Sequence, residues 1–188
     1  MFARTQRLTL RPGWIEDAPA LTAAIAHESV AMKLARLPWP YDLLDAETYL
    51  TMPVAADEAR CLVLAHDMGD TPRLIGGCGI SRIDGAANLG YWLTPDAWGR
   101  GYATEAGRAM LGIARYGLGH RRLGAHHHLD NPASGRVLRK LGFVATGRIE
   151  PRPSRARGAS VPSASYAITL DGFDAGGCDD GDDARMAA

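Results

Sequence analysis

Two glycines separated by one residue stand at Gly99 and Gly101, where a strand is expected to pass into a helix. Thr94-Pro95 ends an apolar stretch before them, and a helical pattern follows over residues 101–118. The first N–H groups of a helix have no partner within the helix and carry the positive end of its dipole. Glycine lets a ligand approach the backbone closely. The spacing predicts an anion cradle suited to a pyrophosphate, although a plain glycine-rich turn has the same pattern.

Other phosphate-binding patterns do not fit this stretch. A dinucleotide fingerprint has a third glycine, lies after the first strand and has an acid about 20 residues later. Here Ala103-Thr104 stands in place of that glycine, and the motif comes late in the chain. The Gly-Lys-Ser/Thr ending of a nucleoside-triphosphate loop is also absent from the sequence.

Three consecutive histidines lie on a strand expected at residues 123–129. Alternation along a strand puts His126 and His128 on one face and His127 on the other. A neutral histidine is a competent base near pH 7. A His-x-His pair can also chelate zinc, but it needs a third ligand, and Asp130 lies far along the same face. We favour a base and expect no metal.

The elements that position these groups form an α+β pattern in residues 1–173, expected to be one domain. A strand, a helix and a strand in succession give one parallel step across the helix that begins at Gly101. The segment 148–163, with four arginines, reads as a long exposed loop, and residues 174–188 as a disordered acidic tail. Strands are expected at residues 6–11, 61–65, 74–83, 87–93, 123–129, 143–149 and 165–170, and helices at 16–25, 29–37, 45–56, 101–118 and 132–141.

Composition narrows the class of protein. The chain has 188 residues, of which 46% are hydrophobic and 22% charged, a normal globular balance. Lysine plus arginine and aspartate plus glutamate each total 21, so the zero net charge gives no general attraction to nucleic acid. No apolar run approaches the roughly 20 residues that cross a bilayer. Three scattered cysteines form no disulfide framework, which favours a cytoplasmic protein. Charge and hydropathy together predict neither nucleic-acid nor membrane partners.

Four ordered stretches resemble the GNAT acetyltransferases, in particular the RimJ/RimL-like branch, which acetylates protein N-termini and small amines. They are residues 5–18, residues 74–79, the motif Pro-x-x-Trp-Gly-Arg-Gly-Tyr-Ala-Thr-Glu-Ala at 95–106, and residues 131–143. The resemblance implies a GNAT fold: a mixed, mostly antiparallel sheet of about six to seven strands, flanked by helices and splayed between its fourth and fifth strands.

The same resemblance implies acetyl-CoA as co-substrate. Leu93 is expected to offer backbone hydrogen bonds to the pantetheine as a neighbouring strand would. Asn131 and Ser134 would meet the pantetheine and thiol end, and Arg139 the adenosine phosphate. The pyrophosphate would be held by backbone N–H groups of Trp98, Gly99, Arg100, Gly101, Tyr102, Ala103 and Thr104.

Direct acetyl transfer through a ternary complex needs a donor for the carbonyl oxygen, an acid and a base. The family pattern implies Leu93 or a neighbour as the donor. Ser134 is the first candidate for the acid that protonates the thiolate, and Tyr166 is the second. For the base, the branch often has a glutamate at the position of Asn88, which cannot accept a proton. His126 and His128 are alternatives, as is solvent, whereas Glu105 has a sufficient structural role at its helix start.

The acceptor is expected to be a protein N-terminus or a small-molecule amine, with Trp39 and Asn88 at its pocket. The arginines of segment 148–163 would favour an acidic acceptor if they lie near the cleft. Asn88 in place of an acid also keeps open a catalytically silent CoA-binding sensor or assembly module. Dimers are common in the family, so a homodimer is compatible with the pattern.

Overall fold

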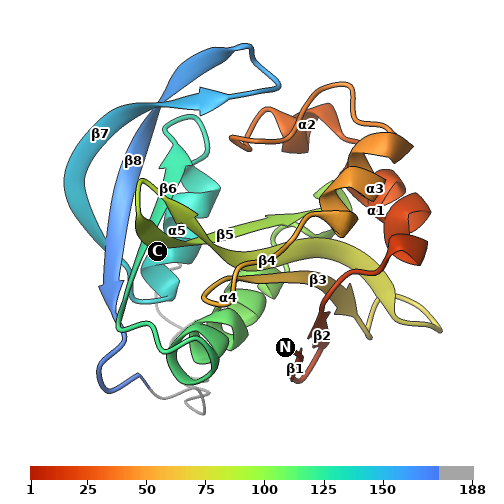
Figure 1. Cartoon of the computed structure of the whole chain (residues 1–188), viewed down its shortest axis with the longest axis horizontal. Coiled ribbons are helices and arrows are strands. Elements are labelled where there is room, and N and C mark those ends of the chain that lie inside the picture. Colours follow the sequence, from red (N-terminus) through yellow and green to blue (C-terminus); the bar gives the residue numbers. More distant parts are fainter. Residues whose placement is uncertain (174–188) are drawn as a thin grey trace, which may run out of the picture.

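The computed structural model describes residues 1–173. They form one open sheet of eight strands in the order β1-β2-β3-β4-β5-β6-β8-β7 (Figure 1). Every neighbouring pair is antiparallel except β5 and β6, which run parallel. The strands are β1 Ala3–Arg4, β2 Leu8–Arg11, β3 Ala59–Ala65, β4 Arg73–Ile83, β5 Ala86–Leu93, β6 Arg122–His128, β7 Val144–Ser154 and β8 Ala159–Thr169.

Helices cover both faces of the sheet (Figure 1). One core packs the sheet against α4 and α5 through residues such as Met110 and Leu138, and the other packs it against α1 and α3 through Leu21 and Ala46. Successive side chains of a strand point to opposite faces. Leu93 therefore belongs to the first core, and Trp92, the residue before it on β5, packs against the second. The helices are α1 Ala18–Ile25, α2 Glu28–Ala31, α3 Leu43–Thr51, α4 Tyr102–Gly112 and α5 Pro132–Lys140.

Helix ends follow the local sequence. Asp42 accepts a hydrogen bond from the Asp45 backbone N–H at 3.0 Å, so α3 begins at Leu43, two residues before the expected start. Asn131 caps α5 in the same way, and Pro132 fills its first position. The helix expected over 101–118 is α4 followed by a π-helical turn at Ile113–Gly117.

The GNAT-type sheet is confirmed, with the two-residue strand β1 added at its edge. The prediction of a long loop at 148–163 is wrong, because β7 and β8 continue through it as a hairpin that turns at residues 155–158. Prolines at 151 and 153 are tolerated because β7 is the edge strand, where a missing N–H removes no bond of an interior ladder. Pro162 lies just beyond the last pair that β8 makes with β6.

Within residues 1–173 no helix is both long enough and apolar enough to cross a membrane. The acidic tail predicted for residues 174–188 lies outside the described residues.

Candidate active site: a cleft where the sheet opens

The parallel strands β5 and β6 separate after a single registered pair, Asn88 with Gly124. On its other side β5 pairs with β4, with Leu93 opposite Gly76. The Thr94 N–H donates to the Ile75 carbonyl at 2.8 Å, which makes Leu93 and Gly76 a pair without mutual hydrogen bonds. The backbone N–H and C=O of Leu93 therefore face away from β4, toward the opening.

Tyr91 lies two residues before Leu93 on β5 and has the same orientation, because bonded and non-bonded pairs alternate along an antiparallel ladder. The Trp98 indole N–H fills one of the exposed acceptors, since it donates to the Leu93 carbonyl at 2.9 Å. The N–H groups of Tyr91 and Leu93 remain directed into the opening. This strand edge has the hydrogen-bonding pattern to receive an extended ligand.

The glycine loop lies at the end of this opening. Gly99 and Gly101 have φ of 75° and 80°, and Gly101 caps the start of α4. Such values suit glycine and strain other residues. The N–H groups of Trp98 and Thr104 bond within the chain, to Pro95 and Gly101. Because these two N–H groups are already used, the amides that remain as candidates to bind a phosphate are those of residues 99–103, at the positive end of α4.

Arg7, in the connection between β1 and β2, braces this loop. Its guanidinium donates to Glu105 at 2.8 Å and to the Arg100 carbonyl at 3.0 Å, and it stacks on the Tyr102 ring at 4.6 Å. Thr5 also donates to Glu105, at 2.6 Å. Burial raises the pKa of Glu105, but the bonds from Thr5 and Arg7 more than offset this and hold the pKa below its ordinary value. Glu105 therefore has a structural position.

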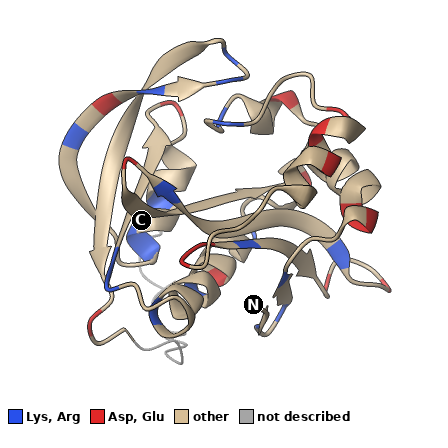
Figure 2. Cartoon of the chain, viewed as in Figure 1, with Lys and Arg blue, Asp and Glu red and all other residues tan. Residues whose placement is uncertain are grey.

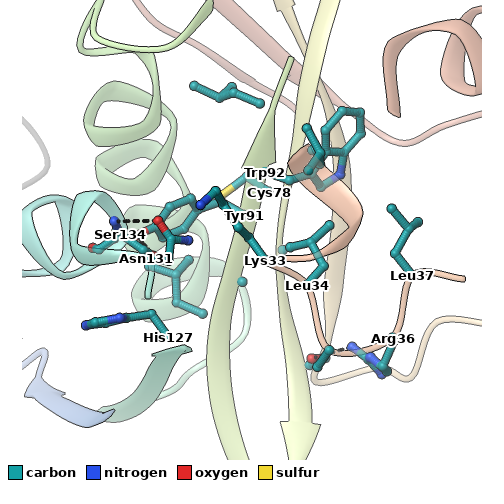
Figure 3. Close-up of a pocket in the computed structure, with 18 of the residues that line it drawn as sticks. Lys33, Leu34, Arg36, Leu37, Cys78, Tyr91, Trp92, His127, Asn131 and Ser134 are labelled. Carbon is teal, nitrogen blue, oxygen red and sulfur yellow. Dashed lines mark hydrogen bonds between the residues drawn. The ribbon is translucent and has the colours of Figure 1, made fainter. Parts of the chain in front are cut away.

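Ser134, at the start of α5, contacts a tyrosine that the motifs did not identify. The Tyr91 hydroxyl lies 2.8 Å from Ser134 Oγ and 3.0 Å from the Ser134 carbonyl oxygen. Asn131 accepts a bond from the Ser134 N–H at 3.4 Å, and all three residues line one wall of the cleft (Figure 3). Burial is the largest cause that raises the pKa of Tyr91, so its hydroxyl stays protonated at neutral pH.

The three histidines divide between the faces of the sheet as alternation predicts. His127 contacts α5 at Gly135 and stacks near Tyr166, with ring centroids 5.5 Å apart. His126 points to the other face, where burial and then the charge of Arg152 lower its pKa to about 4. His128 is also buried, its pKa is lowered chiefly by burial, and its Nδ1 has no hydrogen-bond partner within residues 1–173.

One cleft of about 1680 Å³ connects these features. It is lined on the α4 and α5 side by the glycine loop, Tyr91 and Ser134, and on the α1 to α3 side by residues including Leu34, Trp92 and His126. The cleft therefore runs through the sheet where β5 and β6 separate, and Figure 3 shows residues of both walls in one view. The cleft thus has walls on both faces of the sheet beside Tyr91 and Leu93.

A protein-family model described as an acetyltransferase (GNAT) domain matches residues 7–144. The chain belongs to the GNAT acetyltransferase family. A curated relative, the uncharacterized N-acetyltransferase YoaA of Bacillus subtilis, is 29% identical over 153 residues, which cover 76% of this chain and 82% of the relative.

Solved structures agree with this GNAT fold. A GNAT-family acetyltransferase from Bacillus anthracis has a TM-score of 0.76 at 21% identity and covers 91% of this chain and 99% of its own. RimL, a ribosomal alpha-N-protein acetyltransferase in complex with coenzyme A, has a TM-score of 0.72 at 21% identity, with the same coverage of 91% and 99%.

The features of this GNAT chain fit acetyl-CoA. A Cβ built on Gly99 meets no atom within 4 Å, so this side of the loop is open to a ligand. Arg136 and Lys140 of α5 line the cleft and place two positive charges in its wall. Arg139, the residue predicted for the adenosine phosphate, is not among the lining residues and instead lies 3.4 Å from the Tyr166 hydroxyl.

The remaining predicted residues differ in whether they line the cleft. Tyr166 and Arg100 are outside the set that lines the cleft, and Trp39 is 37% exposed next to lining residues Pro38 and Tyr41. Asn88 lines the cleft, is 9% exposed and donates to the Ala86 carbonyl at 2.9 Å. Among residues 1–173, no three His, Cys, Asp or Glu side chains gather in a group that could hold a metal ion.

Proposed function

We propose that this GNAT protein moves the acetyl group of acetyl-CoA directly to an amine, in a ternary complex of the RimJ/RimL type. The observation that carries the proposal is the free edge of β5 at Tyr91 and Leu93, beside the glycine loop and inside a cleft open to both faces. Acetyl-CoA, when bound, supplies an activated thioester, and all other functions belong to the residues of this chain.

The binding residues have distinct functions along the cleft. Amides 99–103 and the start of α4 bind the pyrophosphate, with Arg136 and Lys140 as nearby cations. Leu93 aligns the extended pantetheine through its backbone. The N–H of Leu93 or of Tyr91 donates to the thioester carbonyl oxygen, where negative charge develops during attack by the amine.

Proton transfer uses groups on the two sides of the opening. The Ser134 hydroxyl protonates the departing thiolate as it takes a proton from Tyr91, whose hydroxyl lies 2.8 Å away, and solvent then returns a proton to Tyr91. His126 and His128 line the acceptor side, and His126 is neutral at pH 7 because its pKa is about 4. Either histidine serves as the base that removes a proton from the amine. Tyr166 contacts His127 and Arg139, which gives it a supporting position.

The two buried cysteines favour direct transfer over an acyl-cysteine intermediate. Cys61 and Cys78 are buried free thiols, and burial raises the pKa of each, which disfavours a nucleophilic thiolate. Their reduced state is also consistent with a cytoplasmic protein. Asn88, whose side chain cannot accept a proton, packs against Gly124 of β6, and the histidines provide bases in place of the missing acid.

The proposal is tested by two measurements on the full chain. Coenzyme A should raise the melting temperature, because a ligand selective for the folded state stabilises it. A panel of primary amines and short peptides should then release free thiol from acetyl-CoA at rates above solvent hydrolysis. Stabilisation without release on any acceptor would favour the sensor, and no stabilisation would remove the cofactor site.

A further inference from the structure

The acceptor side of the cleft is bounded by the segment 32–37, which follows α2, and by the tip of the β7–β8 hairpin (Figure 1). The two are joined by several bonds. The Arg155 N–H donates to the Ala35 carbonyl at 2.8 Å, and the buried Ser154 hydroxyl donates to Leu34 at 3.3 Å. Arg157 donates to the Met32 carbonyl at 2.8 and 2.6 Å. The side chains of this segment are thus presented to the cleft on a fixed backbone.

Two cations of this segment, Lys33 and Arg36, line the cleft, and Figure 3 shows both beside the apolar Leu34 and Leu37. Neither forms an ion pair within residues 1–173, and the Arg36 guanidinium donates to the uncharged Ser81 hydroxyl at 3.1 Å. Arg36 is also close enough to His126 for its charge to lower the pKa of that histidine. A cation therefore lies on the same arm of the cleft as a candidate base.

Two arginines of the hairpin, Arg152 and Arg157, do not supply this charge, whereas Arg155 lines the cleft and forms no ion pair within residues 1–173. Arg152 pairs with Asp84 at 3.1 Å and with Glu150 at 3.4 Å, and Arg157 pairs with Asp130 at 2.6 Å. Figure 2 shows the basic segment after α2 facing the hairpin tip. The carboxylates that line this arm already accept backbone N–H bonds: Asp45 from Asp42, and Glu58 from Arg82.

We infer that the acceptor is an amine that carries its own anionic group. Lys33 and Arg36 bind this anionic group, and the apolar Leu34 and Leu37 contact the part of the acceptor between the amine and the anion. The inference rests on the proposed acetyl transfer and names its substrate class. Charge-assisted hydrogen bonds to an anion are stronger than neutral ones, and an acceptor without the anion leaves both cations unpaired. The same cations repel polyamines and other acceptors with several positive charges.

The test compares matched pairs of acceptors that differ in one carboxylate: alkylamines of three to six carbons against the corresponding ω-amino acids, and phenethylamine against phenylalanine. A short peptide with aspartate at its second position, set against its asparagine counterpart, distinguishes a peptide source from a free amino acid. The anionic member of the best pair should have at least a tenfold higher kcat/KM. Its advantage should shrink as salt screens the charges.

Variants separate this inference from the proposed function. Lys33→Met and Arg36→Met should each reduce the preference for the anionic member about tenfold, measured as the ratio of kcat/KM for the two members of a pair. Arg148→Met removes an exposed arginine outside the cleft lining and should change neither rate. Calorimetric binding of each acceptor to the CoA-bound protein gives a second readout. Equal rates and affinities for the two series, or preferences unaltered in both variants, would overturn the inference. Absence of CoA stabilisation and of thiol release with every amine would instead overturn the proposed function.

Discussion

Asn88 and Gly124 form the pair that joins β5 to β6, and the Asn88 side chain fills the space that a side chain on Gly124 would need. A Cβ built on Gly124 lies 2.6 Å from Asn88 Oδ1, closer than real Cβ contacts. The Asn88 amide in turn donates to Ala86 at 2.9 Å, which limits its freedom to move. The two residues thus set the point from which the strands separate.

The first prediction concerns this pair. Gly124→Ala should lower the free energy of unfolding by about 1–3 kcal/mol, because the new methyl overpacks a buried contact. Asn88→Ala in the same chain removes the obstructing amide and should recover most of that loss. Denaturant unfolding of the two single variants and the double variant measures the coupling between the positions. Additive losses would mean that the contact does not determine the cost.

The sequence predicted the glycine-rich start of α4 because that signal is local. Gly101 begins α4 in a left-handed conformation, which the spacing of glycines and the helical pattern after them already indicate. The contact of Tyr91 with Ser134 joins residues 43 positions apart, and the brace from Arg7 to Glu105 joins residues 98 apart. Periodicity contains no signal for such pairings, which tertiary packing decides.

The hairpin at 148–163 was missed for a related reason. Its prolines, glycine and serines are typical of loops, and their β-strand propensity is low. Strand β7 forms nevertheless, because β8 pairs with it from Pro151–Pro162 to Ser154–Ala159, and as an edge strand it needs bonds on one side. The arginines of this segment were expected to favour an acidic acceptor if they lay near the cleft, but Arg152 and Arg157 pair with Asp84 and Asp130, which are distant in sequence.

The second prediction tests the cradle with a matched glycine. Gly101→Val should abolish the rise in melting temperature that CoA causes, because the side chain at φ 80° distorts the loop that presents amides 99–103. Gly119 has φ of 73°, has no atom within 4 Å of a built Cβ and lies outside the cleft lining. Gly119→Val should cost a similar amount in the protein alone, about 1–2 kcal/mol, yet keep the full response to CoA. A normal CoA response in the Gly101 variant would remove the loop from the binding site.

The third prediction concerns Ser134 and Tyr91. Ser134→Ala should lower kcat by about a hundredfold, the lower range for loss of a general acid, with CoA affinity within about threefold. Tyr91→Phe keeps the ring and removes the hydroxyl that lies 2.8 Å from Ser134 Oγ, so it should lower kcat by about tenfold. Stopped-flow thiol release and CoA titration separate the two parameters. If Tyr91→Phe has a normal kcat, the phenol has no part in proton transfer.

The fourth prediction follows from the depressed pKa of His126, about 4 in the folded protein against an ordinary 6.5. Between these values the unfolded chain binds more protons than the folded one, so this histidine makes stability fall as pH decreases from 6.5 to 4. Above pH 6.5 the ring is neutral in both the folded and the unfolded chain, so the folded protein bears no penalty from this histidine there. His126→Gln should flatten that part of the stability curve, although His128, whose pKa is also lowered, leaves part of the slope. Urea unfolding at a series of pH values measures the slope, and an identical slope in the variant would contradict the assignment.

The same pKa predicts how activity depends on pH if His126 is the base. After correction for the fraction of neutral acceptor, kcat/KM of the native chain should stay flat down to about pH 5, because the histidine remains neutral there. Arg152 is the second cause of the depressed pKa after burial, and its removal leaves the charge of Asp84 uncompensated beside the ring. Arg152→Met should therefore raise the pKa and bring a decrease in rate at acid pH into the range between 5 and 6.5, whereas Arg148→Met should not. A profile that stays flat in Arg152→Met would exclude His126 as the base and leave His128 or solvent to accept the proton.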